Sequence, residues 1–188
     1  MPYITALSGK ASVVPLERSI HHNFLVGNYN ALFAVDTDDG SSYYEIHHNF
    51  LVSAGEGLKS ICGAHDMHHH DNIYAYPWGD CWFVSGGAPG TPGWSGGSGY
   101  NDRFVNNTCI PISNTGTVGY TGDCGELAIG FKVAGTTVMT QNGTLSICGT
   151  SLAKYQALHP GREVGTTVSA WPADDALIAS ARALLENF

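Results

Sequence analysis

The stretch that decides the fold is IHHNFLV, which occupies residues 20–26 and recurs without change at residues 46–52. A looser copy, HHDNIYA, follows at residues 69–75, and another, FVNNTCI, at residues 104–110. These segments start 26, 23 and 35 residues apart. Self-similarity at a period near 25 residues predicts a stack of equivalent structural units. Every copy carries an asparagine, at Asn23, Asn49, Asn72 and Asn107.

The repeated segments are short and rich in aromatic and β-branched residues. Gly, Asn and Asp separate them, which indicates strands joined by turns. Equivalent residues of neighbouring units then lie about 4.8 Å apart. We expect the asparagines to form a buried ladder whose amides hydrogen-bond along the stack. The histidines should form two columns, one of them external: His22, His48 and His70, and His21, His47 and His69.

A second strand register is expected further along each unit. Residues 32–34, 58–60 and 81–83 align at the same spacings of 26 and 23 residues. Alternation along a strand sorts their side chains into an inward set, Leu32, Leu58 and Cys81, and an outward set, Phe33, Lys59 and Trp82. Together the two registers predict an all-β solenoid.

Two further segments stand out from the repeat. Residues 86–101 (GGAPGTPGWSGGSGYN) form a Gly-rich loop that contains Trp94 and Tyr100. These aromatics either pin the loop to the body or stack on a sugar, and both interpretations stay open. Residues 173–186 combine an acidic first turn with one apolar face, which predicts a C-terminal α-helix. We expect this helix to cover an open end of the stack, where strand edges would otherwise be unpaired.

Length and composition narrow the functional classes. The 188 residues fit one domain, and 43% hydrophobic residues exclude a disordered chain. Only 8 Lys and Arg against 16 Asp and Glu give a formal net charge of −8. This charge argues against a nucleic acid or an anionic membrane as partner, and against a polyanionic substrate unless a cation bridges the two. No window approaches the roughly 18 apolar residues of a membrane span.

The cysteines and two sequons favour an extracellular protein. The five cysteines form no CxxC pair, so a zinc ribbon is not indicated. The pairings Cys62–Cys81 and Cys109–Cys124 each close a short loop and leave Cys148 over, although spacing alone does not set the connectivity. Glycosylation is expected at Asn106 and Asn142, which begin Asn-X-Thr sequons. Residues 1–19 lack a signal peptide, so we expect a fragment of a longer secreted chain.

The repeats HHNFLV, HHNFLV, HDNIYA and VNNTCI, together with residues 38–44 (DDGSSYY), 57–66 and 151–157, resemble the right-handed parallel β-helix proteins of the pectate-lyase-like superfamily. The resemblance covers roughly residues 15–170. It implies a right-handed parallel β-helix with a C-terminal helix as a single domain over 1–188. It also implies a Lys or Arg base in the lyase members, a role that Lys59 would take unless it pairs with Asp36 or Asp66.

The acidic residues suggest a second chemistry. Hydrolysis of a glycosidic bond needs two carboxyl groups, one protonated and one ionised. Asp38 or Asp39 follows one unit's strand and Asp66 follows the next, so they are expected at one edge. The alternative is that Asp38 and Asp39 belong only to a turn. His65 beside Asp66 forms a further candidate pair, because a carboxylate orients an imidazole.

Metal binding is the lesser alternative for the histidines. His65, Asp66, His68 and His70 are the candidate ligands for a transition metal, whereas a Ca²⁺ site would use the acidic residues. No cofactor is required by the sequence, and Ca²⁺ is the one ion that the prediction names.

These features predict a secreted carbohydrate-binding or carbohydrate-active protein, with polysaccharide hydrolysis preferred. A glycan would stack on Phe33, Trp82, Trp94 and Tyr100, and the chemistry would fall to Asp38, Asp39, Lys59, His65 and Asp66. Polysaccharide lyase or epimerase activity is a further alternative. A different class is a non-catalytic structural glycoprotein of a coat, filament or matrix, which would self-associate through its open strand edges.

Overall fold

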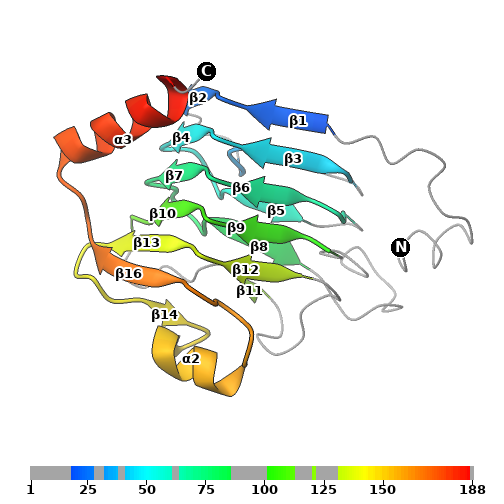
Figure 1. The fold of residues 1–188 in the computed structure, drawn as a ribbon, viewed down its shortest axis with the longest axis vertical. Coiled ribbons are helices and arrows are strands. Elements are labelled where there is room, and N and C mark those ends of the chain that lie inside the picture. Colours follow the sequence, from blue (N-terminus) through cyan, green and yellow to red (C-terminus); the bar gives the residue numbers. More distant parts are fainter. Residues whose placement is uncertain are drawn as a thin grey trace, which may run out of the picture.

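The computed structural model describes residues 18–27, 32–37, 41–60, 64–85, 101–112, 120–121 and 131–186. Its strands build two large parallel sheets that lie side by side in the view of Figure 1, with their strands stacked along the same direction. The five-stranded sheet contains, in spatial order, β1 (Arg18–His21), β3 (Tyr44–His47), β6 (His68–His70), β9 (Arg103–Val105) and β12 (Lys132–Ala134). The six-stranded sheet contains β16 (Thr167–Ala170), β13 (Thr137–Thr140), β10 (Thr108–Ile110), β7 (Ile73–Ala75), β4 (Phe50–Val52) and β2 (Phe24–Val26).

Smaller elements complete the fold. A three-stranded parallel sheet contains β11 (Tyr120–Thr121), β8 (Trp82–Ser85) and β5 (Leu58–Ser60). A two-stranded antiparallel sheet contains β14 (Ser146–Ile147) and β15 (Thr150–Ser151), and the helices are α2 (Leu152–Leu158) and α3 (Asp174–Glu186). Among the described residues, no helix has the length and apolar character needed to cross a membrane.

The repeat sets the register of both large sheets. In the five-stranded sheet Ile20 pairs with Ile46, and Ile46 pairs with His69. His69 in turn pairs with Phe104, so the spacings of 26, 23 and 35 residues are confirmed. Phe24 and Phe50 show the same spacing of 26 in the six-stranded sheet.

The asparagine ladder is also confirmed. The side-chain amide of each asparagine donates to the Oδ1 atom of the next, from Asn23 through Asn49 and Asn72 to Asn107, at 2.9 Å in all three steps. Each of these Oδ1 atoms also accepts the backbone N–H of the preceding ladder residue, at 3.0 Å. Three of the four asparagines are 1% exposed, so the ladder satisfies polar groups that water does not reach.

The predicted fold class, an all-β right-handed parallel β-helix closed into a solenoid, is wrong. The described residues form parallel sheets of five and six strands together with two helices, an arrangement closer to α/β. The physical reason lies in the six-stranded sheet, where β7 is buried along its whole length. Parallel strands that are covered on both faces are continuously apolar, and a helix commonly supplies the outer cover.

Helix α3 supplies that cover. Its residues Leu177 and Ala181 are buried in one apolar cluster with Phe50, Ile73 and Ala75 of the six-stranded sheet. The predicted helix at 173–186 is therefore confirmed, but its predicted place over the end of the stack is wrong. An apolar sheet face offers a helix more burial than a strand edge, because the edge needs hydrogen-bonding groups.

Helix α2 is not predicted by the sequence patterns. The Ser151 hydroxyl caps its first turn by accepting from the Lys154 backbone N–H at 3.4 Å. Tyr155 is its one buried residue. A helix of 7 residues is too short to show a clear apolar period, which explains why the pattern does not reveal it.

The disulfide pairing differs from both predicted pairs. Cys81 is bonded to Cys109, so neither Cys62–Cys81 nor Cys109–Cys124 forms. Cys148 is also disulfide-bonded, although the sequence left it over. Cys62 and Cys124 lie outside the described residues. Spacing along the chain does not show that Cys81, just before β8, and Cys109 of β10 face one interior.

The second predicted register is displaced at both steps. Leu58 pairs with Trp82 rather than with Cys81, a shift of one residue, and Phe33 bridges to Glu56 rather than to Lys59, a shift of three. Trp82 is fully buried and Phe33 is 8% exposed, so their predicted outward orientation is wrong. Because side chains alternate along a strand, a slip of one residue moves every side chain to the opposite face.

Candidate metal centre

The candidate site is built on the corner that follows each strand of the five-stranded sheet. The backbone has a positive φ, between 52° and 64°, at five equivalent corner residues: His22, His48, Asp71, Asn106 and Gly135. Asn, Asp and His are the non-glycine residues that tolerate this left-handed conformation most often. The backbone therefore favours these residue types at the position just before the ladder asparagine.

The corner side chain contacts the last residue of the strand before it. His47 and His48 approach through their Nδ1 atoms at 2.8 Å, and His70 Nδ1 lies 2.8 Å from Asp71 Oδ2. The rings of His21, His47 and His70 are stacked, with centroids 4.9 and 5.0 Å apart. The external histidine column is thus present.

The predicted membership of the two columns is wrong in the third unit. His70 follows His47, while Asp71 takes the corner that His22 and His48 occupy in the first two units. His69 pairs with Ile46 and is fully buried. The ladder asparagine sets this register, because Asn72 must lie in line with Asn49.

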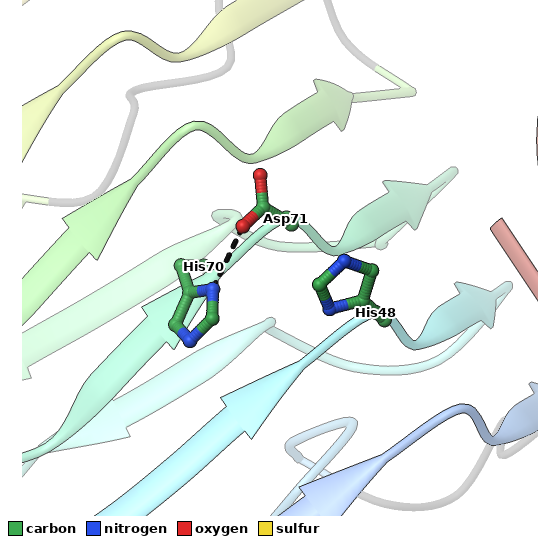
Figure 2. Close-up of side chains that lie close together, drawn as sticks. All are labelled: His48, His70 and Asp71. Carbon is green, nitrogen blue, oxygen red and sulfur yellow. Dashed lines mark hydrogen bonds and ion pairs between the residues drawn. The ribbon is translucent and has the colours of Figure 1, made fainter. Parts of the chain in front are cut away.

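His48, His70 and Asp71 come together as a cluster of potential metal ligands. One ligand atom of each residue lies within 4.8 Å of the others, and all three residues are partly exposed. Figure 2 shows the two rings and the carboxylate close together, with His70 and Asp71 at the end of β6 and His48 in the neighbouring turn between β3 and β4. Two imidazoles and one carboxylate form a set that binds zinc in proteins and leaves one tetrahedral position open.

The surrounding charges orient the ligands. His70 Nε2 lies 3.1 Å from Glu45 Oε1. An ionised carboxylate can only accept, so Nε2 carries the proton in this contact, and the hydrogen bond lowers the pKa of Glu45. His70 Nδ1 is then the nitrogen that faces Asp71. A carboxylate that fixes the tautomer of a ligand histidine is a common partner of zinc sites.

The pKa values of the neighbouring imidazoles separate. Burial lowers the pKa of His70, but the hydrogen bonds and negative charges of Asp71 and Glu45 outweigh it, and the pKa is raised overall. Burial, followed by the charge of His70, lowers the pKa of His47. The outer column therefore does not behave as a row of identical bases.

Two grooves meet at the cluster. One, of about 550 Å³, lies over the five-stranded sheet and is lined among others by Glu45, His70, Asp71, Arg103, Asn106 and Lys132. The other, of about 650 Å³, is lined by His22, His47, His48, Asp71 and three residues of α3. A ligand can approach the cluster from either side.

The predicted catalytic pair His65–Asp66 is in contact but lies elsewhere. His65 Nδ1 is 2.7 Å from Asp66 Oδ2, and Asn101 donates to Asp66 Oδ1 at 3.2 Å. Asp66 takes the left-handed conformation at the corner before β6, whereas the metal cluster lies at the corner after it. His65 is 3% exposed, which leaves little of its ring open to a substrate.

Lys59 adopts the alternative of an ion pair. Its Nζ lies 2.7 Å from Asp36 Oδ1, and its ammonium also lies 4.6 Å from the centre of the Phe33 ring. The Lys59 side chain is only 5% exposed. The structure does not bring it together with Asp66 through any contact that it describes. Asp38 and Asp39 lie outside the described residues.

The structure describes two of the four predicted sugar-stacking residues. Phe33 and Trp82 are buried, so neither ring presents a face to a sugar. Trp94 and Tyr100 lie outside the described residues. The sequon residues Asn106 and Asn142 are both exposed, and their glycosylation stays a prediction.

Of the four predicted transition-metal ligands, the cluster contains only His70. His48 and Asp71 are the ligands that the sequence analysis does not identify. The signal that points to them is the alignment of the asparagines, which places His48 and Asp71 at one corner position in neighbouring units. The alignment does not show that this corner faces outward, so it does not predict that His70 lies close to His48 and Asp71.

Comparison with known proteins adds no relative. No family model matches the chain, and neither a curated protein nor a solved structure is similar to it. The resemblance to pectate-lyase-like proteins therefore has no support beyond the motifs that suggested it.

Proposed function

We propose that this protein binds a divalent transition metal through His48, His70 and Asp71. The observation that carries the proposal is the convergence of their ligand atoms within 4.8 Å on a partly exposed corner. Imidazole nitrogens favour Zn²⁺, Cu²⁺ or Ni²⁺, whereas Ca²⁺ takes six to eight oxygen ligands. The donor set therefore favours a transition metal over the predicted Ca²⁺.

The test is calorimetric titration of tag-free, chelator-treated protein with Zn²⁺ and with Ca²⁺. We expect one tight Zn²⁺ site per chain and no comparable Ca²⁺ binding. His48→Asn and Asp71→Asn each remove a ligand while keeping a residue that suits the left-handed corner. Each should weaken Zn²⁺ binding at least about tenfold, because even partners of ligands contribute that much.

His22→Asn is the matched control. His22 occupies the same corner one unit away and its ring stacks on His48 at 5.1 Å, but it is outside the cluster. Its loss should change the affinity less than about threefold. Unchanged Zn²⁺ binding in both cluster variants would contradict the proposal, as would an equal loss in the control. Carbohydrate binding, secretion and self-association stay predictions of the sequence.

A further inference from the structure

The groove beside the metal cluster carries a pair of cationic side chains. Arg103 and Lys132 are direct partners in the register of β9 and β12, and both are exposed. In the part of the chain that the structure describes, neither side chain forms a hydrogen bond or an ion pair. Like charges opposite each other on neighbouring strands repel and destabilise the sheet.

This pairing is unusual for a chain with a net charge of −8 and only 8 Lys and Arg. Glu45 and Asp71 both line the groove, but each is hydrogen-bonded to His70.

The shape of the surface provides the space for a ligand. The histidine column ends at His70, and the next residues in that column are Val105 and then Ala134. These smaller side chains leave the groove of about 550 Å³ between the cationic pair and the corner residue Asn106. Asn106 also lines it and is exposed, so its amide is a further polar group at the rim.

We infer that this groove binds a small ligand through an oxyanion group, a carboxylate, phosphate or sulfate, held by Arg103 and Lys132 next to the metal. The inference rests on the proposed function, because the open coordination position of the metal is the second contact of the ligand. Guanidinium and ammonium groups bind these oxyanions by charge-assisted hydrogen bonds. The metal adds positive charge beside the cationic pair, which strengthens the attraction of an anion to a protein whose net charge is negative.

The test compares three probes, sodium acetate, phosphate and sulfate, by calorimetric titration of metal-free and of Zn²⁺-loaded protein. We expect at least one anion to bind the metal-free protein and to bind the Zn²⁺-loaded protein at least about tenfold more tightly. By linkage the same anion must raise the Zn²⁺ affinity by the same factor. The anion with the largest factor identifies the oxyanion class.

Variants separate the pair from charge in general. Arg103→Gln and Lys132→Gln should each weaken anion binding at least about tenfold, since a hydrogen bond to a charged group is lost. Lys154→Gln removes an exposed lysine on α2, outside the groove, and should change it less than about twofold.

Several results would overturn the inference. They are the absence of binding for all three anions, equal binding to both protein forms, and binding that is indifferent to Arg103 and Lys132. Zn²⁺ titration without any anion tests the proposed function separately. A protein that binds Zn²⁺ but none of the anions keeps that function and loses only the groove.

Discussion

Two columns of repeated side chains run along the same corner of the stack, and they differ in the use of their polar groups. The asparagine ladder faces the interior, where every side-chain amide step is hydrogen-bonded at 2.9 Å. The histidine column faces outward, with rings stacked about 5.0 Å apart. In the interior, the side-chain polar groups of the asparagines are hydrogen-bonded to one another. Outside, it leaves ring nitrogens near one another with partners that a metal can replace.

Adjacent residues of one strand show the difference most clearly. His69 points inward, is fully buried, and has a pKa lowered to about 3 by burial. His70 points outward, and the carboxylates around it raise its pKa. One histidine is held neutral by the core and the other is held near negative charge, so chemistry toward ligands is confined to the outer face.

The largest expected effect comes from breaking the inner column in its middle. Asn72 Oδ1 accepts both the backbone N–H and the side-chain amide of Asn49, and its own amide donates to Ile46 O and Asn107 Oδ1. Asn72→Ala leaves buried donors unsatisfied, which should lower the free energy of unfolding by about 3 kcal/mol. Chemical denaturation measures the loss.

Asn23→Ala is the control for this variant. Asn23 ends the ladder and is exposed, so water can replace its bonds and the loss should be about 1 kcal/mol. If both variants lose the same amount, the ladder is no more stabilising in the interior than at its end, and the contrast between the two columns disappears.

The asparagine ladder was predictable because an asparagine holds the same place in every copy of the repeat, although the copies are 26, 23 and 35 residues apart. The second register lacked such a marker. Nothing in the sequence around Cys81 and Trp82 distinguishes a spacing of 23 from one of 24, and a slip of one residue reverses the faces. The both-sided burial of β7 and the short helix α2 depend on tertiary packing, which a pattern along the chain does not contain.

The same reasoning explains what was missed at the site. Residue types showed that histidine and aspartate were concentrated in the repeat, but ligand geometry depends on the corner. His48 and Asp71 both have a positive φ, which directs their side chains toward His70. Their residue types indicate that this conformation is tolerated, but not which way the side chain then points. The disulfide Cys81–Cys109 is equally invisible, since it joins residues that only the stack brings together.

A second inward polar group predicts a smaller, pH-dependent effect. Asp102 is fully buried, its Oδ1 accepts the Met67 backbone N–H at 2.9 Å, and its Oδ2 has no partner among the described residues. Burial raises its pKa to about 8. Its contribution to stability is present below its ordinary pKa of about 4 and is lost as the pH rises through about 8.

Asp102→Asn keeps the acceptor for Met67 and removes the charge. The wild-type protein should lose about 2 kcal/mol of stability between pH 5 and pH 6.5 through this group, whereas the variant should not. Denaturation at both pH values tests this. Glu186→Gln, at the exposed end of α3, is the control and should leave the pH dependence unchanged. Parallel pH curves for wild type and Asp102→Asn would mean that the interior accommodates the charge.

The smallest expected effect concerns the buried His69, the neighbour of His70 in the chain. Because the pKa of His69 is lowered to about 3, its contribution to stability is present above the ordinary pKa of about 6.5 and is lost as the pH falls toward 3. His69→Phe, which places in this unit the residue that Phe104 provides in the next, should remove about 1.6 kcal/mol of the stability loss between pH 6.5 and pH 5.

The readout for His69→Phe is the slope of stability with pH and not the stability itself. The substitution also removes the 2.8 Å hydrogen bond between Tyr74 and His69 Nδ1, which changes the stability at every pH. Tyr74→Phe in the same background removes the unsatisfied hydroxyl without adding a titrating group in this range. Both variants should therefore show the same flattened acid limb. The outer variant His70→Gln should not flatten it, because the raised pKa of His70 stabilises the protonated form and its contribution is lost toward high pH instead. A flattened acid limb in His70→Gln alone would place the acid sensitivity on the outer face and reverse the distinction between the two columns.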